Sequence, residues 1–102
     1  MNRPEILDTA KKCVCGEREQ DYGTPESNFS TIANLWIDYL TGKGQSVELN
    51  AVDVAVMLAL LKISRISSGH GKSDNWVDLA GYAACGGEIE NRLISKTEAG
   101  GK

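Results

Sequence analysis

Two acidic residues and two basic residues of this 102-residue chain have the types and spacing of a chemical site. Asp74 and Asp78 are four residues apart, so on a helix both carboxylates lie on the same face. Lys62 and Arg65 are three residues apart and also share a helix face. Carboxylates are ligands for Mg²⁺, and bases bind phosphate oxygens. The spacing therefore indicates a mixed site with Asp74 and Asp78 as metal ligands and Lys62 and Arg65 as phosphate-binding residues.

The two pairs meet only if the helices that carry them form a hairpin. If the turn is centred on residues 70–71, residues at equal distances from it lie opposite each other, and Asp78 falls within ion-pair reach of Lys62 or Arg65. Asn75 then faces the same bases as a candidate substrate-binding residue. An alternative interpretation is a set of interhelix ion pairs that only fix the register, because most charged contacts of this type are structural.

A second polar cluster lies in the segment "EREQDYG". Arg18 and Tyr22 are one helical turn apart, so they are candidates to clamp a phosphate and to stack on a base. The alternative is a solvated helix end, with Tyr22 closing over the core. His70 lies in the glycine-flanked loop "GHGK", which lacks the spacing of a P-loop and reads as a hairpin turn.

Start and stop signals predict an all-α fold of about four helices, with the third and fourth forming a central hairpin in an oligomeric bundle. Capping boxes begin the first and third helices, and a Thr-Pro pair begins the second. The expected helices run from Asn2 to the sequence "DYG", from Pro25 to Thr41, from Asn50 to the loop "SSGHGKS", and from a Ser73 or Asp74 cap to about Ile94. Residues 1–94 form one domain, and residues 95–102 are expected to be a disordered tail.

The third helix predicts how the chain assembles. Residues 54–61 are apolar on every side, so we expect this helix to be buried all round and to be the most buried element. A chain this short has too few helices to cover it. The fourth helix adds a small-residue face, which fits either a tight intramolecular hairpin or a dimer seam. Together the two helices predict a homo-oligomer, a dimer or a tetramer. That face comprises Ala80, Ala83, Ala84 and Gly87.

Composition restricts the class of protein. A net charge of −3 does not favour a nucleic-acid partner, but a local basic pocket can still bind a single nucleotide. Three cysteines and one histidine do not favour a disulfide framework or a zinc site. The N-terminus has no apolar signal segment, and no apolar run is long enough to cross a bilayer. We expect a cytoplasmic protein with no membrane partner.

Three blocks of the chain resemble a family of small helical proteins that phages and prophages encode. The blocks are "REQDYGTPESNFSTIANLW", "DVAVMLALLKISRISSG" and "KSDNWVDLAGYAACGGEIE", and together they cover most of the chain. The family is known mainly as a domain of unknown function. The resemblance implies a phage or prophage origin, and hence the host cytoplasm, but no activity.

The chain is more loosely similar to the MazG-like all-α nucleoside triphosphate pyrophosphohydrolases. In that superfamily E-x-x-E on one helix and E-x-x-D on the next bind Mg²⁺, and the proteins assemble as dimers or tetramers. Here "NWVD" matches the second motif, with Asn75 in place of its first acid. Lys62 and Arg65 stand where the facing acids are expected, and Asp53 is the nearest acid of the third helix. The resemblance implies Mg²⁺-dependent conversion of a nucleoside triphosphate to a monophosphate and pyrophosphate.

Two functional hypotheses follow. The first is a MazG-like nucleotide-binding protein or pyrophosphohydrolase, in which Asp74 and Asp78 hold Mg²⁺ and a metal-bound water attacks. The second is a non-catalytic helical homo-oligomer that serves as a protein-interaction module, in which the same charges are paired within the chain. The first predicts a nucleotide ligand, and the second predicts none.

Overall fold

The computed structural model describes residues 1–16, 23–69 and 72–100, with side chains described as far as Lys96. The helices of these residues are α1 (Arg3–Val14), α3 (Pro25–Gly42), α4 (Ala51–Ser67) and α5 (Ser73–Gly100). The described residues form no β-strand, which confirms the all-α prediction. Over the same residues, no helix combines the length and apolar character that crossing a membrane requires.

Side-chain caps begin three of the helices where the sequence predicts them. The Asn2 side chain accepts a hydrogen bond from the Glu5 amide at 3.0 Å, and the Glu5 carboxylate reaches back to the Asn2 amide. Asn50 and Asp53 form the same reciprocal box at 3.0 and 2.9 Å. Thr24 accepts from the amide of the residue three positions on, ahead of a proline in the first turn of α3. These bonds satisfy amides that no helical carbonyl can reach.

Two helix ends differ from the expectation. α1 stops at Val14 instead of continuing to "DYG", because Gly16 adopts a left-handed backbone conformation with φ of 73°. α5 continues past the expected helix end at Ile94 as far as Gly100. No glycine or proline interrupts residues 95–99, and Lys96 also reaches Glu26 of α3 at 3.8 Å.

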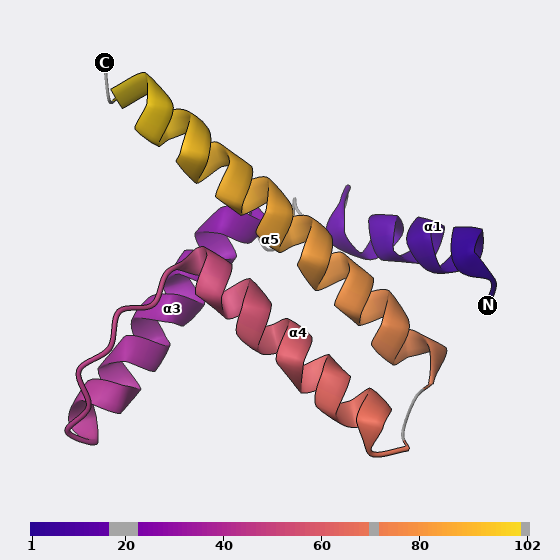
Figure 1. Ribbon diagram of the computed structural model, residues 1–102, viewed down its shortest axis with the longest axis horizontal. Helices are drawn as coiled ribbons and strands as arrows, with labels where there is room; N and C mark the ends of the chain where they lie inside the picture. Colours follow the sequence, from indigo (N-terminus) through magenta and orange to yellow (C-terminus); the bar gives the residue numbers. More distant parts are fainter. Residues whose placement is uncertain (17–22, 70–71, 101–102) are drawn as a thin grey trace.

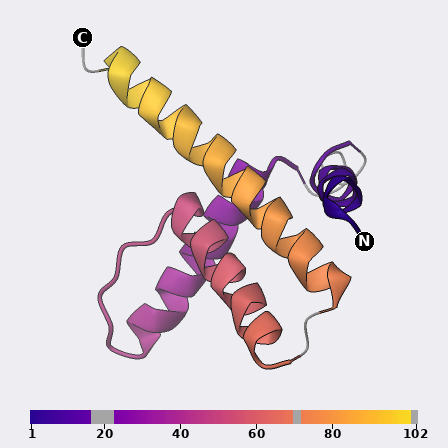
Figure 2. The same cartoon turned by 45° about the vertical axis from the view of Figure 1, so that its right-hand side comes forward.

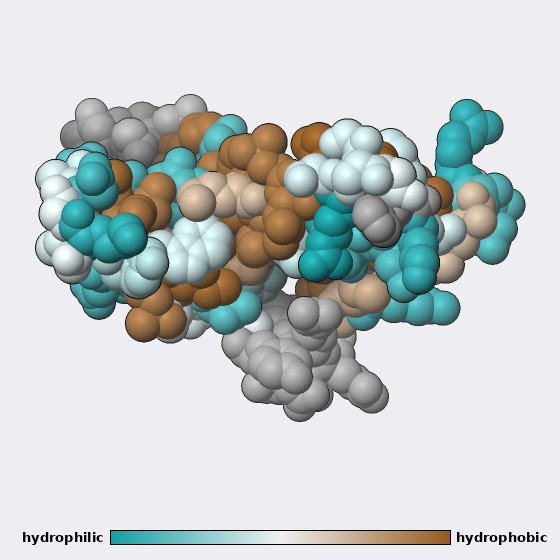
Figure 3. Space-filling view, turned by 90° about the horizontal axis from the view of Figure 1, so that it is seen from below, coloured by the Kyte–Doolittle hydropathy of each residue, from teal (hydrophilic) through white to brown (hydrophobic). Residues whose placement is uncertain are grey.

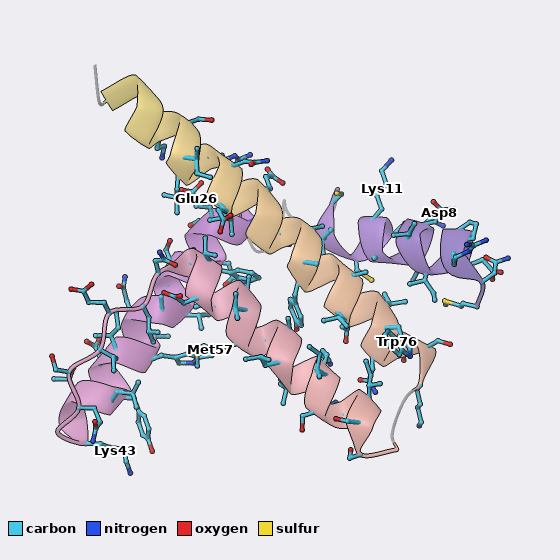
Figure 4. All side chains as sticks on the ribbon, in the orientation of Figure 1. Asp8, Lys11, Glu26, Lys43, Met57 and Trp76 are labelled. Atoms are coloured by element: carbon cyan, nitrogen blue, oxygen red, sulfur yellow. The ribbon has the colours of Figure 1, made fainter. Side chains whose placement is uncertain are left out.

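α5 is the central element of the fold (Figure 1). α4 runs beside its first half, α1 lies on its other side, and α3 crosses near the start of α4 (Figures 1 and 2). Glu26 lies where α3 meets α5 and pairs with Arg92 at 3.6 Å (Figure 4). The core fills the space between α3, α4 and α5. Its buried residues are Phe29, Ala33, Ala51, Val54, Ala55, Cys85 and Ile89.

Two glycines of α5 allow neighbouring helices to approach closely. A Cβ atom at Gly86 would lie 2.9 Å from the Cβ of Ala55 in α4, and one at Gly81 would lie 3.0 Å from a methyl group of Val14 in α1. The first contact is closer than real Cβ atoms come and the second would require Val14 to shift, so both glycines allow close packing within the chain. Gly87 has open space around it. Gly86, next to the small-residue face, therefore serves the intramolecular hairpin, whereas Gly87 of that face has no neighbour within the chain that requires a glycine.

The expectation that α4 is buried all round is wrong for the single chain. Val54 and Ala55 are buried, but Val56 and Met57 are 52% and 43% exposed, and Leu60 is 56% exposed. α5 covers one side of α4 and α3 covers only the region near its start (Figure 2). The chain has no further described helix to cover the opposite side.

Replacing Ile89 with alanine is expected to lower the free energy of unfolding by about 2–5 kcal/mol, because this side chain is only 1% exposed. Leu7→Ala is the matched control, since Leu7 is 63% exposed and its loss should cost less than about 0.5 kcal/mol. Urea denaturation measures both. Equal losses would show that the core does not lie between α3, α4 and α5.

Candidate functional site

An ion pair joins α4 to α5. The Nζ atom of Lys62 lies 2.8 Å from Oδ2 of Asp78, which confirms the prediction that Asp78 reaches Lys62 or Arg65. The Lys62 side chain is 12% exposed and that of Asp78 is 40% exposed. The ammonium group is therefore largely desolvated, while the carboxylate keeps contact with solvent. Such a pair can fix the helix register, and its carboxylate side can still meet a ligand.

Three further candidates lie on the same two helices, namely Arg65, Asp74 and Asn75. Arg65 is exposed, and within the described part of the chain it makes no ion pair. Asp74 is exposed in the first turn of α5. Asn75 is 8% exposed, so its side chain is largely buried within one chain. Hairpin geometry thus brings Lys62 and Asp78 into contact, and Arg65 and Asp74 lie about one helical turn from them on the same two helices.

The acidic residues do not form a metal centre by themselves. Among residues 1–16, 23–69 and 72–96, no three His, Cys, Asp or Glu side chains lie close enough to hold an ion. The Asp78 carboxylate is already neutralised by Lys62. Mg²⁺ usually takes one or two carboxylates and completes its shell with waters and substrate phosphates. The carboxylates here therefore fit an Mg²⁺ ion that is already bound to the phosphates of a ligand better than an ion that the protein holds alone.

A pocket of about 90 Å³ lies beside the ion pair, between α1, the start of α3 and α5. Asp78 belongs to both features, since its carboxylate contacts Lys62 and the residue also lines the pocket. The aromatic rings of Phe29 and Tyr82 and the amide of Asn28 supply further walls. The other lining residues are Cys13, Val14, Gly23, Pro25, Val77, Gly81 and Cys85.

Three of the sequence-predicted candidates, Arg18, Tyr22 and His70, lie outside the described residues. Arg18 and Tyr22 are nevertheless close in the sequence to residues that line the pocket. Tyr22 directly precedes Gly23, which lines the pocket, and the segment 17–22 begins shortly after Val14, which also lines it. The described residues on either side of this segment, Val14 and Gly23, both line the pocket.

Sequence reasoning missed the pocket itself. On the apolar face of a helix, a residue that lines a pocket, such as Phe29, looks the same in the sequence as a core residue. The available signal was the spacing on α5, because Asp78, Tyr82 and Cys85 lie at i, i+4 and i+7 and so share one face.

Asp78→Asn is expected to lower the free energy of unfolding more than Lys62→Met. The first change leaves a largely buried ammonium group without its partner, which should cost about 2–3 kcal/mol, less than for a fully buried pair. The second leaves a carboxylate that water can solvate, which should cost less than about 1 kcal/mol. Chemical denaturation of both variants measures the difference. Losses in the reverse order would show that Lys62 is solvated and that the pair contributes little.

The comparisons with known proteins agree with the phage resemblance. Residues 5–90 match the domain of unknown function DUF6378. The chain is 46% identical over 93 residues to the Gene 55 protein of Mycobacterium phage L5, covering 91% of this chain and 55% of that protein. It is 39% identical over 80 residues to the Gene 55 protein of Mycobacterium phage D29, covering 78% of this chain and 50% of that protein.

The chain thus spans about half the length of these curated phage relatives. No solved structure matches it. The match over residues 5–90 includes all of α3 and α4 and the part of α5 that carries Asp78. The chain therefore belongs to the DUF6378 family, a domain of unknown function with relatives in phages.

Proposed function

We propose that this phage-type protein binds a nucleotide at the pocket between α1, α3 and α5. The observation that carries the proposal is the position of Asp78, which lines the pocket and pairs with Lys62 at its edge. Tyr22 and Arg18 remain candidates for this site, because Tyr22 directly precedes the lining residue Gly23 in the chain.

The lining chemistry fits the base of a nucleotide. Phe29 and Tyr82 offer aromatic surface, and Asn28 and Asp78 offer polar groups that can pair with ring nitrogens or exocyclic amines. A volume of about 90 Å³ is smaller than the roughly 300–1,000 Å³ of typical ligand pockets. The pocket therefore accommodates one part of the ligand, and the phosphates extend outside it.

Exposed charges close to the ion pair would meet those phosphates. Arg65 is exposed on the turn after Lys62 and has no carboxylate partner in the described part of the chain. Asp74 is exposed one turn before Asp78, so we assign it the contact to a Mg²⁺ ion carried by the phosphates, with Asp78 next to it. The looser similarity to MazG-like enzymes makes release of pyrophosphate the reaction to assay.

A second candidate function is a non-catalytic homo-oligomer that acts as a protein-interaction module. The observation that favours it is the exposed apolar surface of α4, where Val56, Leu60 and Leu61 are each about half exposed. Large apolar side chains clustered on a surface mark interaction sites more often than solvated faces. The two candidates use different surfaces, so one protein can have both functions.

Nucleoside triphosphates are expected to raise the melting temperature of the protein, more strongly with Mg²⁺. At about 100 times the dissociation constant, binding stabilises the native state by about 2.7 kcal/mol. For a chain of this size that corresponds to a shift on the order of 10 °C. Differential scanning fluorimetry with each nucleotide, with and without Mg²⁺, measures it, and pyrophosphate release is assayed in parallel.

The ligand-dependent shift should disappear in Asp78→Asn and shrink in Arg65→Gln. Asp38→Asn is the control, because Asp38 is an exposed acid on α3 away from the pocket. The comparison uses the shift caused by the nucleotide and not the absolute melting temperature, since Asp78→Asn also removes the ion pair. No shift with any nucleotide, or the same shift in all three variants, would contradict nucleotide binding at this pocket.

A further inference from the structure

One side of α4 presents large apolar side chains to solvent with no charge among them. Val56, Leu60 and Ile63 form a stripe at helical spacing, and they are 52%, 56% and 47% exposed. Met57 and Leu61 widen it at 43% and 48% exposed. Figure 3 shows hydrophobic side chains gathered across the middle of the molecule, seen from the side on which α4 lies. In Figure 4 Met57 points from α4 toward the side of α3.

Two of the three charged residues of α4 are engaged within the chain, and the third, Arg65, is exposed two residues beyond Ile63 at the end of the stripe. Lys62 points to Asp78 and is only 12% exposed. The Asp53 carboxylate accepts a hydrogen bond from the Asn50 amide at 2.9 Å in the N-terminal cap. A solvated helix face normally carries Lys, Glu or Arg. This one has the composition of the central part of an interface.

A groove runs beside the stripe. It has a volume of about 240 Å³ and lies between α4 and α5. Ala55 and Gly86 both line it, and a Cβ atom at Gly86 would lie 2.9 Å from the Cβ of Ala55. Ala83 and Gly87 form its far side and are both exposed. The remaining lining residues are Val52, Val56, Ala59, Tyr82 and Glu90.

The chain exposes more surface than a compact monomer of its mass. The chain exposes 7310 Å². A compact monomer of 11.0 kDa exposes roughly 5,600 Å². The radius of gyration is 15.4 Å, against roughly 13 Å for a compact domain of this length. The excess surface is larger than the roughly 800 Å² that each partner buries in a stable dimer.

We propose that a second copy of this chain covers this region through the α4–α5 face, defined as Val56, Leu60, Ile63, Ala83 and Gly87. The stripe and the groove lie next to each other on one chain. In a dimer with a two-fold axis between the stripe and the groove, the stripe of each copy packs into the groove of the other copy. The face is therefore self-complementary. This proposal deepens the self-association of the second candidate function and does not depend on nucleotide binding.

Sedimentation of the full chain between about 1 and 100 µM tests the proposal. The wild type is expected to sediment at twice its 11.0-kDa mass. Leu60→Glu should weaken the dimer at least about 100-fold, because each dimer would bury two carboxylates in an apolar seam. Leu7→Glu is the matched control, since Leu7 is 63% exposed on α1 and lies outside the face. It should leave the dimer intact.

Gly87→Gln separates a change of the interface from a change of the fold. Glutamine is a better helix former than glycine and meets open space in the single chain, so α5 should remain folded and gain helix stability. The longer side chain fills the groove, so the dimer should weaken at the same time. Circular dichroism confirms folding of each variant.

A wild type that stays monomeric up to 100 µM would overturn both self-association and this face. A dimer that survives Leu60→Glu and Gly87→Gln would overturn the α4–α5 face alone, and self-association would then use another surface. Loss of the dimer in Leu7→Glu as well would also overturn the assignment, because the effect would not be specific to the face.

Discussion

The rest of the structure depends on the close contact between α4 and α5 at Gly86 and Ala55. The missing Cβ of Gly86 lets the two backbones approach to a distance that any other residue would prevent. That contact sets the register of the hairpin, and the register in turn places Lys62 opposite Asp78. It also brings Val54 and Ile89 into one core, where both are almost fully buried. A residue with a side chain at position 86 would separate the helices and displace the ion pair along with the core.

The same contact limits how much of α4 the chain can cover. A helix packed against one neighbour along its length, and against a second near its start, keeps one side free. In α4 that side is apolar, because the sequence from Val54 to Leu61 contains no polar residue. The excess surface of the chain follows from this arrangement. The apolar pattern of α4 is consistent with a bundle of more helices than one chain provides, which a second copy would supply.

The polar features centre on Asp78 of α5, which lies between Lys62 of α4 and a pocket that α1 and α3 also line. The carboxylate of Asp78 contacts the desolvated ammonium group of Lys62, and Asp78 also lines a pocket together with Phe29 and Tyr82. A charge pair of this kind is a compromise between structure and chemistry, since the partner that fixes the carboxylate also neutralises it. This explains why the described acids do not resemble a four-carboxylate metal centre, and why the phosphates of a ligand would have to supply most of the shell of any Mg²⁺ ion.

The sequence by itself determined the helical class, the starts of the helices and the facing of Lys62 and Asp78. These depend on local signals, such as the Asn2 and Asn50 capping boxes, and on counting residues from a hairpin turn. Only the tertiary structure decided which side of α4 is buried, because a helix that is apolar all round carries no sign of the direction from which its neighbours come. It also decided that Gly86 is packed while Gly87 is free, although the two are adjacent and identical in type. The pocket depended on tertiary structure for the same reason, since its walls come from three helices whose relative placement no local pattern encodes.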